Sequence, residues 1–227
     1  MKKVMLISGG SSGFGKALAA EMAKEHQVVI LARSEEETAA AAKEMGCDYV
    51  LADMADAAAV QKAAEQVLSK YGRVDVLVNN AGIWIQGPLE ENDPARIKAT
   101  MDVNATGTIL LTHALLGAMK KAGSGRIINV ISQAGLAWKK ERSVYNASKW
   151  AITGFTKSLA DELHGTGVTV AGFYPGPMKT ALFEKAGVQK DTSKAMELSD
   201  AVRAVTFIID TPDDLEIPEL GITPTFY

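Results

Sequence analysis

Residues 7–23, ISGGSSGFGKALAAEMA, join a short apolar run to a helical segment through the spaced glycines Gly9, Gly13 and Gly15. Glycine reaches backbone angles that are closed to other residues, and it lets a phosphate group approach the main chain closely. The helix that follows offers free N–H groups and the positive end of its dipole to such a phosphate. A glycine turn can also merely close a tight connection, but this one links the first apolar run to the first helix. The stretch therefore predicts dinucleotide binding.

Outward from this turn, apolar runs alternate with helical segments along the whole chain. The runs are rich in Val, Ile and Leu, as in strands buried on both faces of a parallel sheet. Helix-start signals stand between them, among them the capping box of Ser34 with Glu37 and the pair Asp93–Pro94. Strands are predicted over 2–9, 26–32, 47–53, 74–80, 125–132 and 167–175, and helices over 13–24, 34–45, 56–71, 94–121, 145–164 and 199–210. This alternation predicts the α/β class, with one doubly wound parallel sheet covered by helices on both faces, as a single domain over 1–227.

Composition and charge exclude several classes of protein. The formal net charge of −3 and the pI near 5.7 give no reason to expect a nucleic acid or an anionic membrane as partner. The single cysteine, Cys47, rules out an internal disulfide, and the three histidines show no metal-ligand spacing, so no metal site is predicted. The N-terminal apolar run is too short for a signal peptide, and no apolar run reaches the about 18 residues of a membrane span. A cytoplasmic protein is predicted.

The end of the second predicted strand bears on the choice of dinucleotide. NAD sites usually carry an Asp or Glu there, about 20 residues after the glycine turn, to bind the adenosine ribose. This chain instead has Ala32, followed by Arg33 and Ser34. A guanidinium binds a phosphate through two hydrogen bonds and keeps its charge, which suits the 2′-phosphate of NADP(H). Arg33 could instead be a solvated loop residue, and Ser34 is also the helix cap, but the pair favours NADP(H) over NAD(H).

Further motifs follow in order along the chain: NNAG at 79–82, Asn104 in MDVNATGT, Ser132 in IINVIS, Tyr145-x-x-x-Lys149, and Pro175-Gly176 with Thr180. Tyr145 stands 13 residues after Ser132. With these motifs and the glycine turn, the chain resembles the short-chain dehydrogenase/reductase family over residues 2–180. The resemblance implies a Rossmann-type fold and an oxidoreductase that uses a nicotinamide cofactor on a small-molecule carbonyl or alcohol.

The resemblance also implies which residues act. The catalytic tetrad would be Asn104, Ser132, Tyr145 and Lys149. Together with the turn and the end of the second strand, the cofactor contacts would be Gly9, Ser11, Ser12, Gly13, Phe14, Gly15, Arg33, Ser34, Asp53, Met54, Asn80, Ala81, Gly82, Tyr145, Lys149, Pro175, Gly176, Met178 and Thr180. The resemblance further implies a homo-oligomer, a dimer or a tetramer, built on the long helices 94–121 and 145–164.

Three features depart from the family pattern. Ser8 stands where Thr is more common and keeps the hydroxyl, while Phe14 replaces a smaller aliphatic residue and is expected to crowd the turn. The C-terminal segment 211–227, TPDDLEIPELGITPTFY, resembles the abbreviated ending of a subset of small bacterial members rather than the usual seventh strand. The sequence therefore predicts neither a last sheet strand nor the tetramer contacts that such a strand carries.

Tyr145 and Lys149 lie one helical turn apart, so their side chains share a helix face. Taken alone, this spacing would fit an ordinary surface pair. Reduction of a carbonyl develops negative charge on its oxygen, which the Tyr145 O–H can protonate. A nearby Lys149 cation, together with the oxidised nicotinamide, is expected to lower the pKa of that phenol. Lys149 could also hold the nicotinamide ribose, Ser132 would bind the substrate oxygen, and from the resemblance alone Asn104 would hold a water that links Lys149 to solvent.

The substrate pocket is predicted from the segments after NNAG, after Ser132 and after Pro175. Their substrate-contacting side chains are Trp84, Gln86, Trp138 and Phe183, which suggest an apolar or aromatic carbonyl compound. Lys139 and Lys140 would attract an anionic substrate, although two lysines in a loop are more often solvated. The polar segment 180–198 is predicted to form a mobile lid over the substrate.

Two other functions are open alternatives. A redox sensor or scaffold would bind NADP without turnover, but it would be expected to lack part of the tetrad, which is complete here. A nucleotide-sugar epimerase or dehydratase also uses the Tyr-x-x-x-Lys motif. Such enzymes normally need a sizeable C-terminal substrate domain, and fewer than 50 residues follow Thr180.

Overall fold

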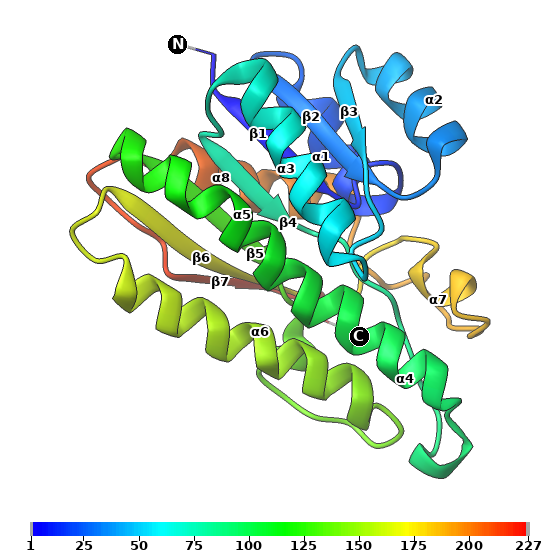
Figure 1. Cartoon of the computed structure of the whole chain (residues 1–227). Coiled ribbons are helices and arrows are strands. Elements are labelled where there is room, and N and C mark those ends of the chain that lie inside the picture. The colour runs from blue at the N-terminus through cyan, green and yellow to red at the C-terminus, as the bar shows by residue number, and fades with distance from the viewer. Residues whose placement is uncertain (1, 226–227) are drawn as a thin grey trace.

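One parallel sheet of seven strands runs through the molecule in the order β3-β2-β1-β4-β5-β6-β7, with helices on both faces (Figure 1). The structure is a computed structural model that describes residues 2–225; Met1, Phe226 and Tyr227, at the ends of the predicted 1–227 domain, lie outside the described residues. The predicted α/β class and doubly wound sheet are confirmed. The strand order reverses between β1 and β4, and open sheets of this kind bind ligands beyond the carboxyl ends of the strands at such a switch point.

Strands and helices alternate along the chain, as the sequence predicts. The strands are β1 (Val4–Ser8), β2 (Gln27–Ala32), β3 (Asp48–Leu51), β4 (Val76–Asn79), β5 (Gly125–Val130), β6 (Val168–Pro175) and β7 (Glu219–Ile222). The helices are α1 (Gly13–Met22), α2 (Glu35–Met45), α3 (Ala57–Tyr71), α4 (Pro94–Met101), α5 (Gly107–Ala122), α6 (Ser143–Glu162), α7 (Leu182–Lys185) and α8 (Leu198–Asp210), with the short turns η1 (Leu89–Glu91), η2 (Asp102–Thr106) and η3 (Gln133–Gly135). Within residues 2–225, no helix is long and apolar enough to cross a membrane.

Local side chains fix where several helices begin and end. Asp56 and Asp93 each accept a hydrogen bond of 2.9 Å from a backbone N–H in the first turn of α3 and α4. Ser34 caps α2 by accepting from the Glu37 N–H at 3.5 Å, as its capping-box spacing predicts. Gly46 ends α2 with a left-handed φ of 65°, which residues with a Cβ rarely adopt.

Two apolar layers hold the helices on the sheet. On one face, α1, α2 and α8 pack against strand side chains such as Ile7 and Phe173. On the other face, α3, α5 and α6 pack against side chains such as Leu6 and Leu77 (Figure 1). Leu6 and Ile7 are neighbours in the chain but serve opposite layers, because successive side chains of a strand point to opposite faces. This double burial explains the near-continuous apolar runs in the sequence.

The C-terminal segment does form a seventh strand, so the sequence analysis is wrong there. β7 pairs in parallel with β6, with Leu220 opposite Phe173. It is a short edge strand whose side chains are half-buried or exposed, which is why no apolar run marks it. Arg126 holds the chain that leads to it, because its buried guanidinium donates hydrogen bonds to carbonyls at the end of α8, including Ile208 O at 2.5 Å and Thr211 O at 2.7 Å.

The predicted helix over 94–121 is interrupted at η2. Residues Asp102–Thr106 form one turn of π-helix between α4 and α5. Such wide turns are rare and often occur at functional sites. This one carries Asn104, whose side chain is 1% exposed.

Candidate active site

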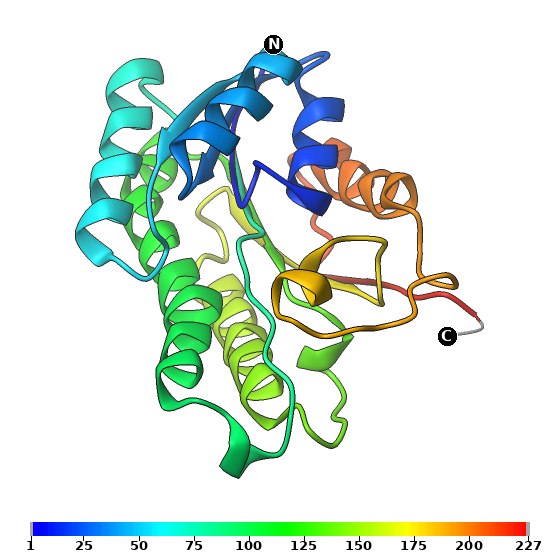
Figure 2. The ribbon, with the colours of Figure 1, turned by 90° about the vertical axis from the view of Figure 1, so that its right-hand side faces the viewer.

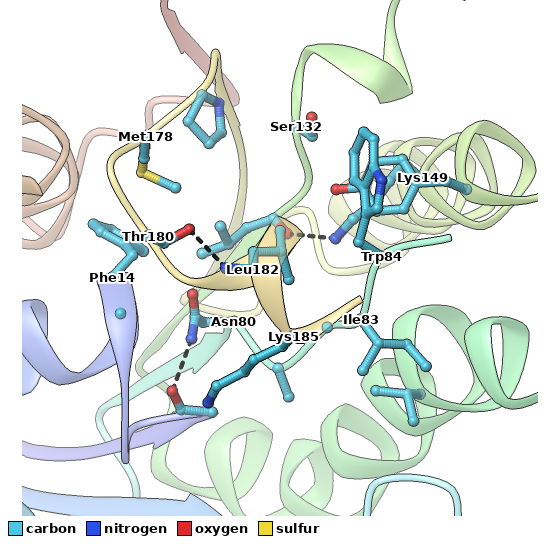
Figure 3. Close-up of a pocket in the computed structure, with 18 of the residues that line it drawn as sticks. Phe14, Asn80, Ile83, Trp84, Ser132, Lys149, Met178, Thr180, Leu182 and Lys185 are labelled. Atoms are coloured by element: carbon cyan, nitrogen blue, oxygen red, sulfur yellow. Dashed lines mark hydrogen bonds between the residues drawn. The ribbon is translucent and has the colours of Figure 1, made fainter. Parts of the chain in front are cut away.

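A cavity of about 630 Å³ opens at the carboxyl ends of the strands. Its walls come from the turn after β1, the NNAG segment after β4, the residues between β5 and α6, and the segment after β6 that carries α7. Figure 2 shows this last segment beside the ends of the strands. Figure 3 shows Phe14 and Met178 on one side of the cavity and Trp84 and Lys149 on the other. The volume lies in the range of cofactor and ligand sites, about 300–1,000 Å³.

The glycine turn and the NNAG segment are packed directly on each other. A Cβ on Gly9, where φ is 66°, would lie 2.9 Å from the Ala81 Cα, and a Cβ on Gly15 would lie 2.4 Å from the Asn80 Nδ2. The Asn80 amide donates to Ser8 O at 2.9 Å. The Ser8 hydroxyl accepts from the backbone N–H groups of Asn80 and Ala81 at 3.0 and 3.1 Å. Glycines and a small hydroxyl residue are therefore needed here for close approach.

The start of α1 fits a phosphate group. Ser11, Ser12 and Gly13 line the cavity there, and Gly13 has a left-handed φ of 56°. Ser12 is the N-cap residue of α1, but its side chain makes no capping hydrogen bond to the first-turn N–H groups. The Ser12 hydroxyl is instead hydrogen-bonded to Lys185 of α7, whose Nζ lies 3.2 Å from the Ser12 Oγ. Helix N–H groups, a glycine and a lysine together suit the pyrophosphate of a dinucleotide.

The end of β2 forms the far end of the cavity. Arg33, Ser34 and Asp53 line it. The Arg33 side chain is 80% exposed, and its guanidinium lies 3.7 Å from the Asp53 carboxylate. Ion pairs this exposed contribute little stability, so they hold a guanidinium only weakly. Arg33 is thus accessible to an anionic group bound at this rim.

Tyr145 lies in the first turn of α6, buried beside Ser132. Ser132 has a φ of 135°, a strained value for a residue other than glycine, and such strain often marks functional sites. Its hydroxyl accepts from the Ala134 N–H at 3.1 Å and is hydrogen-bonded to Tyr145. Burial raises the pKa of Tyr145 to about 12, against the smaller lowering effects of the Ser132 hydrogen bond and the Arg142 charge. Among the chain's own groups, desolvation therefore outweighs the lowering that the sequence analysis expects from Lys149.

Lys149 lies one turn further along α6. Its Nζ donates to Val130 O at 3.1 Å and lies 5.9 Å from the centroid of the Tyr145 ring. Desolvation lowers the pKa of Lys149 to about 8, so the ammonium is charged below that pH. A Cβ on Gly82 would lie 3.7 Å from this Nζ. The lysine therefore lies against the NNAG segment in the wall of the cavity.

The Asn104 side chain is hydrogen-bonded to the residue that follows the NNAG segment. Its Oδ1 accepts from the Ile83 N–H at 2.8 Å, and its Nδ2 donates to Ile83 O at 3.0 Å. The second Nδ2 hydrogen goes to the Ser148 Oγ at 3.1 Å. One amide hydrogen and the amide oxygen therefore fix the chain that follows NNAG, and the other amide hydrogen ties Asn104 to α6, next to Lys149. A water held by Asn104, as the resemblance implies, stays a prediction.

Aromatic side chains surround Tyr145. The Trp84 ring centroid lies 4.2 Å from that of Tyr145 and 4.8 Å from that of Phe183, the latter edge to face. Trp84 and Phe183 are buried in one apolar cluster with Tyr145. Trp138 lies at the rim of the cavity and is 81% exposed. This end of the cavity therefore has apolar walls around one phenolic hydroxyl.

Most of the predicted site residues line this one cavity. Of the predicted cofactor residues these are Gly9, Ser11, Ser12, Gly13, Phe14, Arg33, Ser34, Asp53, Met54, Asn80, Ala81, Gly82, Tyr145, Lys149, Pro175, Gly176, Met178 and Thr180. Gly15 and Asn104 lie behind the wall. Gln86 is not among the residues that line the cavity, so its predicted contact with the substrate has no support in the structure. Phe14 does not crowd the turn; its ring packs into the core 5.9 Å from Phe173.

Several residues of the cavity wall were not predicted, and four of them bring polar or charged groups from outside the motifs. Arg142 begins α6, Lys185 and Lys190 lie in the predicted lid, and Thr223 follows β7. A Cβ on Gly176 would lie 2.6 Å from the Thr223 Oγ1, so the C-terminal segment packs on the turn after β6. No motif marks these positions. The only signal in the sequence is the number of lysines between 180 and 198.

Comparisons with known proteins give one consistent result. Residues 3–191 match the family described as short chain dehydrogenase. An uncharacterized oxidoreductase of Staphylococcus saprophyticus is 30% identical over 229 residues, which cover 98% of this chain and 97% of that protein. A metagenomic short-chain oxidoreductase solved with NADP has a TM-score of 0.84 at 31% identity, covering 99% and 98% of the two chains. A 3-ketoacyl-(acyl-carrier-protein) reductase from Brucella melitensis solved with NADH has a TM-score of 0.90 at 29% identity, covering 98% and 97%.

Proposed function

Because the chain belongs to the short-chain dehydrogenase family, we propose that it interconverts a ketone or aldehyde and an alcohol, with NADP(H) as its cofactor. One observation carries the proposal: a buried Tyr145, hydrogen-bonded to Ser132 and followed by Lys149, shares one cavity with a phosphate-binding helix start. Proton exchange with a substrate oxygen needs such a hydroxyl in a site that excludes water.

In this mechanism the protein manages the proton and the charge on oxygen. When bound, the nicotinamide cofactor supplies the hydride for reduction, or accepts it in oxidation. The Ser132 hydroxyl binds the substrate oxygen, and Tyr145 donates its proton as negative charge develops there. Burial raises the pKa of Tyr145, so the phenol carries the proton that it donates at neutral pH. In the oxidation direction Tyr145 accepts the alcohol proton, and the Lys149 cation stabilises the resulting phenolate.

Asn104 has a positioning role in this proposal. It fixes the main chain of Ile83 through two hydrogen bonds, and that segment lies against Lys149. The orientation of the lysine relative to Tyr145 then depends on the π-turn that carries Asn104.

Arg33 supports the preference for NADP(H) over NAD(H). No carboxylate stands at Ala32, where NAD sites usually have one, and an accessible guanidinium stands next to it. Of the two acidic side chains at this end, Glu37 and Asp53, Asp53 is paired with Arg33. One structural neighbour was solved with NADP and another with NADH. The preference therefore rests on Arg33 and on the residue types around it.

The proposal includes two further features. The segment 180–198 acts as a lid, since Phe183, Lys185 and Lys190 of this segment line the cavity. The chain forms a homo-oligomer, a dimer or a tetramer, through its long helices, where Ile109 of α5 and Trp150 of α6 are 38% and 46% exposed.

The direct test is oxidation of NADPH and NADH in the presence of a panel of aldehydes, ketones and diketones. We expect turnover with NADPH, and a loss of at least about 100-fold in kcat for Tyr145→Phe, which removes the general acid. The variant should keep the rise in melting temperature that NADPH gives the wild type, because its ring is unchanged. Undiminished turnover in this variant would contradict the assigned acid. Cofactor binding without turnover on any carbonyl would favour the redox sensor.

A further inference from the structure

Two cations flank the indole ring of Trp84 at the catalytic end of the cavity. The Arg142 guanidinium carbon lies 5.2 Å from the Trp84 ring centroid. The Lys190 Nζ lies 5.8 Å from the same ring and 4.2 Å from the Phe183 ring centroid. Aromatic faces attract cations and hold them in place. The two charges are therefore positioned by the same rings that surround Tyr145.

The Arg142 charge is felt both by Tyr145 and by Lys190. The Arg142 charge is among the groups that lower the pKa of Tyr145. Burial, and next the charge of Arg142, lower the pKa of Lys190. Two cations that disfavour each other in a partly buried site are stabilised when an anion binds between them.

The carboxylates of the cavity lie elsewhere. The two acidic side chains in its wall, Glu37 and Asp53, belong to the end where Arg33 lies. Near the catalytic end, Glu141 pairs with Lys140 at 3.8 Å, and Asp191 accepts from the Ser193 N–H at 2.8 Å. Among residues 2–225, no carboxylate lies within ion-pair distance of the Arg142 guanidinium.

Trp84 itself offers an unused donor at this place. Its side chain is 6% exposed, and its Nε1 has no hydrogen-bond partner among the described residues. Buried indole N–H groups usually have a partner, and one left without it costs free energy. Trp84 lines the cavity, but its Nε1 atom is itself buried, so a bound ligand supplies the missing acceptor only after a shift of the ring or its neighbours.

We propose that the carbonyl substrate carries a carboxylate or phosphate group a few bonds from the reacting carbonyl, bound by Arg142, Lys190 and the Trp84 indole N–H. The guanidinium can bind either group through two hydrogen bonds, the lysine neutralises charge, and the indole donates one further hydrogen bond. This inference rests on the proposed carbonyl chemistry and narrows its substrate class. It differs from attraction by Lys139 and Lys140, because Arg142 and Lys190 lie over the Trp84 ring that packs on Tyr145.

Matched pairs of ketones test the proposal. Acetoacetate is compared with ethyl acetoacetate, and dihydroxyacetone phosphate with dihydroxyacetone, with NADPH as reductant. In at least one pair we expect the anionic ketone to have a kcat/KM about tenfold or more above that of the neutral ketone. A preference for acetoacetate would indicate a carboxylate site, and a preference for dihydroxyacetone phosphate a phosphate site. The preference should fall by about tenfold in Arg142→Gln and Lys190→Gln, chiefly through a higher KM for the anion. Trp84→Phe, which keeps a ring but loses the N–H, should lower it less.

Lys140→Gln is the matched control. It removes one positive charge from the same loop, at a side chain that is 93% exposed and outside the cavity wall. We expect it to leave the anion preference unchanged. Melting temperatures of all variants show that each one is folded.

The outcomes separate this inference from the proposed function. Turnover of the neutral ketones with no anion preference, or a preference that survives in Arg142→Gln, would overturn the anion site and leave the carbonyl chemistry intact. If no ketone is reduced, calorimetric titration of the NADP-saturated protein with propionate and with inorganic phosphate decides the binding question. Binding of one anion that is lost in Arg142→Gln supports the site, and equal weak binding by both proteins, or none, overturns it.

Discussion

The ammonium of Lys185 in α7 lies 3.2 Å from the hydroxyl of Ser12 at the start of α1, although the two residues are 173 positions apart in the chain. The contact joins the predicted lid to the glycine turn that is proposed to hold the cofactor phosphates. A ligand that binds at the turn is therefore within reach of a charge from the lid. We therefore expect the position of the proposed lid and the binding of the proposed dinucleotide to be coupled.

Replacement of Lys185 by Gln should weaken both cofactors alike. The pyrophosphate is common to NADPH and NADH, so we expect the Kd of each to rise by about three- to tenfold, the size of an exposed ionic contact. Titration of the protein with each cofactor measures this change in Kd. Lys179→Gln is the control, since Lys179 pairs with Glu197 and does not line the cavity. Equal Kd values for the wild type and Lys185→Gln would show that the lysine does not reach the bound cofactor.

Arg33→Ala should change the choice of cofactor. Loss of a charge-assisted contact to the 2′-phosphate should raise the Kd of NADPH by about tenfold or more and leave that of NADH nearly unchanged. Arg203→Ala, which removes an exposed arginine that pairs with Asp200 on α8, should affect neither. A wild type that prefers NADH would contradict the role given to Arg33.

Catalysis should depend on pH through Lys149. Burial lowers the pKa of Lys149 to about 8. The ammonium is therefore present below pH 8 and is lost as the pH rises through that value. Because kcat/KM reports the ionisations of the enzyme form that binds the varied substrate, NADPH is varied at saturating carbonyl. We expect kcat/KM to be flat below about pH 8 and to fall above it. In Lys149→Arg, whose charge persists to much higher pH, the fall near pH 8 should be absent even though the rate is lower.

Ser8→Ala should destabilise the fold without touching the catalytic groups. The buried hydroxyl accepts hydrogen bonds from the backbone N–H groups of Asn80 and Ala81 at 3.0 and 3.1 Å. Leaving these donors without their acceptor should lower the free energy of unfolding by about 1–3 kcal/mol, measured by urea denaturation. Ser8→Thr keeps the hydroxyl and should retain most of that stability. An alanine variant as stable as the wild type would show that these donors find other partners.

Much of the fold follows from local patterns. The helix caps at Ser34 and Asp93 and the apolar runs are set by side chains within a few residues of each other, so their signals are visible in the sequence. β7 is not visible in this way. Its half-buried edge position needs no apolar run, and the chain leading to it is held by Arg126 from a distant strand.

The candidate site likewise has parts that could be predicted from the sequence and parts that could not. The glycine turn and the Tyr145–Lys149 motif could be predicted because each is defined by spacing along one element. Gln86 does not line the cavity although Trp84 does, because position after NNAG alone does not decide which side chains face the site. The raised pKa of Tyr145 in the chain alone could not be predicted, because desolvation depends on Trp84 and other residues that fold around the phenol; the lowering expected from Lys149 together with the oxidised nicotinamide stays a prediction.

By itself, the sequence of this protein determined the alternation of strands and helices, the glycine turn after the first strand and the helical spacing of Tyr145 and Lys149. These depend on backbone periodicity and on contacts within one or two turns. Only the tertiary structure decided that Arg142 and Lys190, from separate segments, face one indole ring beside Tyr145. Burial and the distances between charges depend on which distant segments pack together, and the local spacing of residues does not determine this packing.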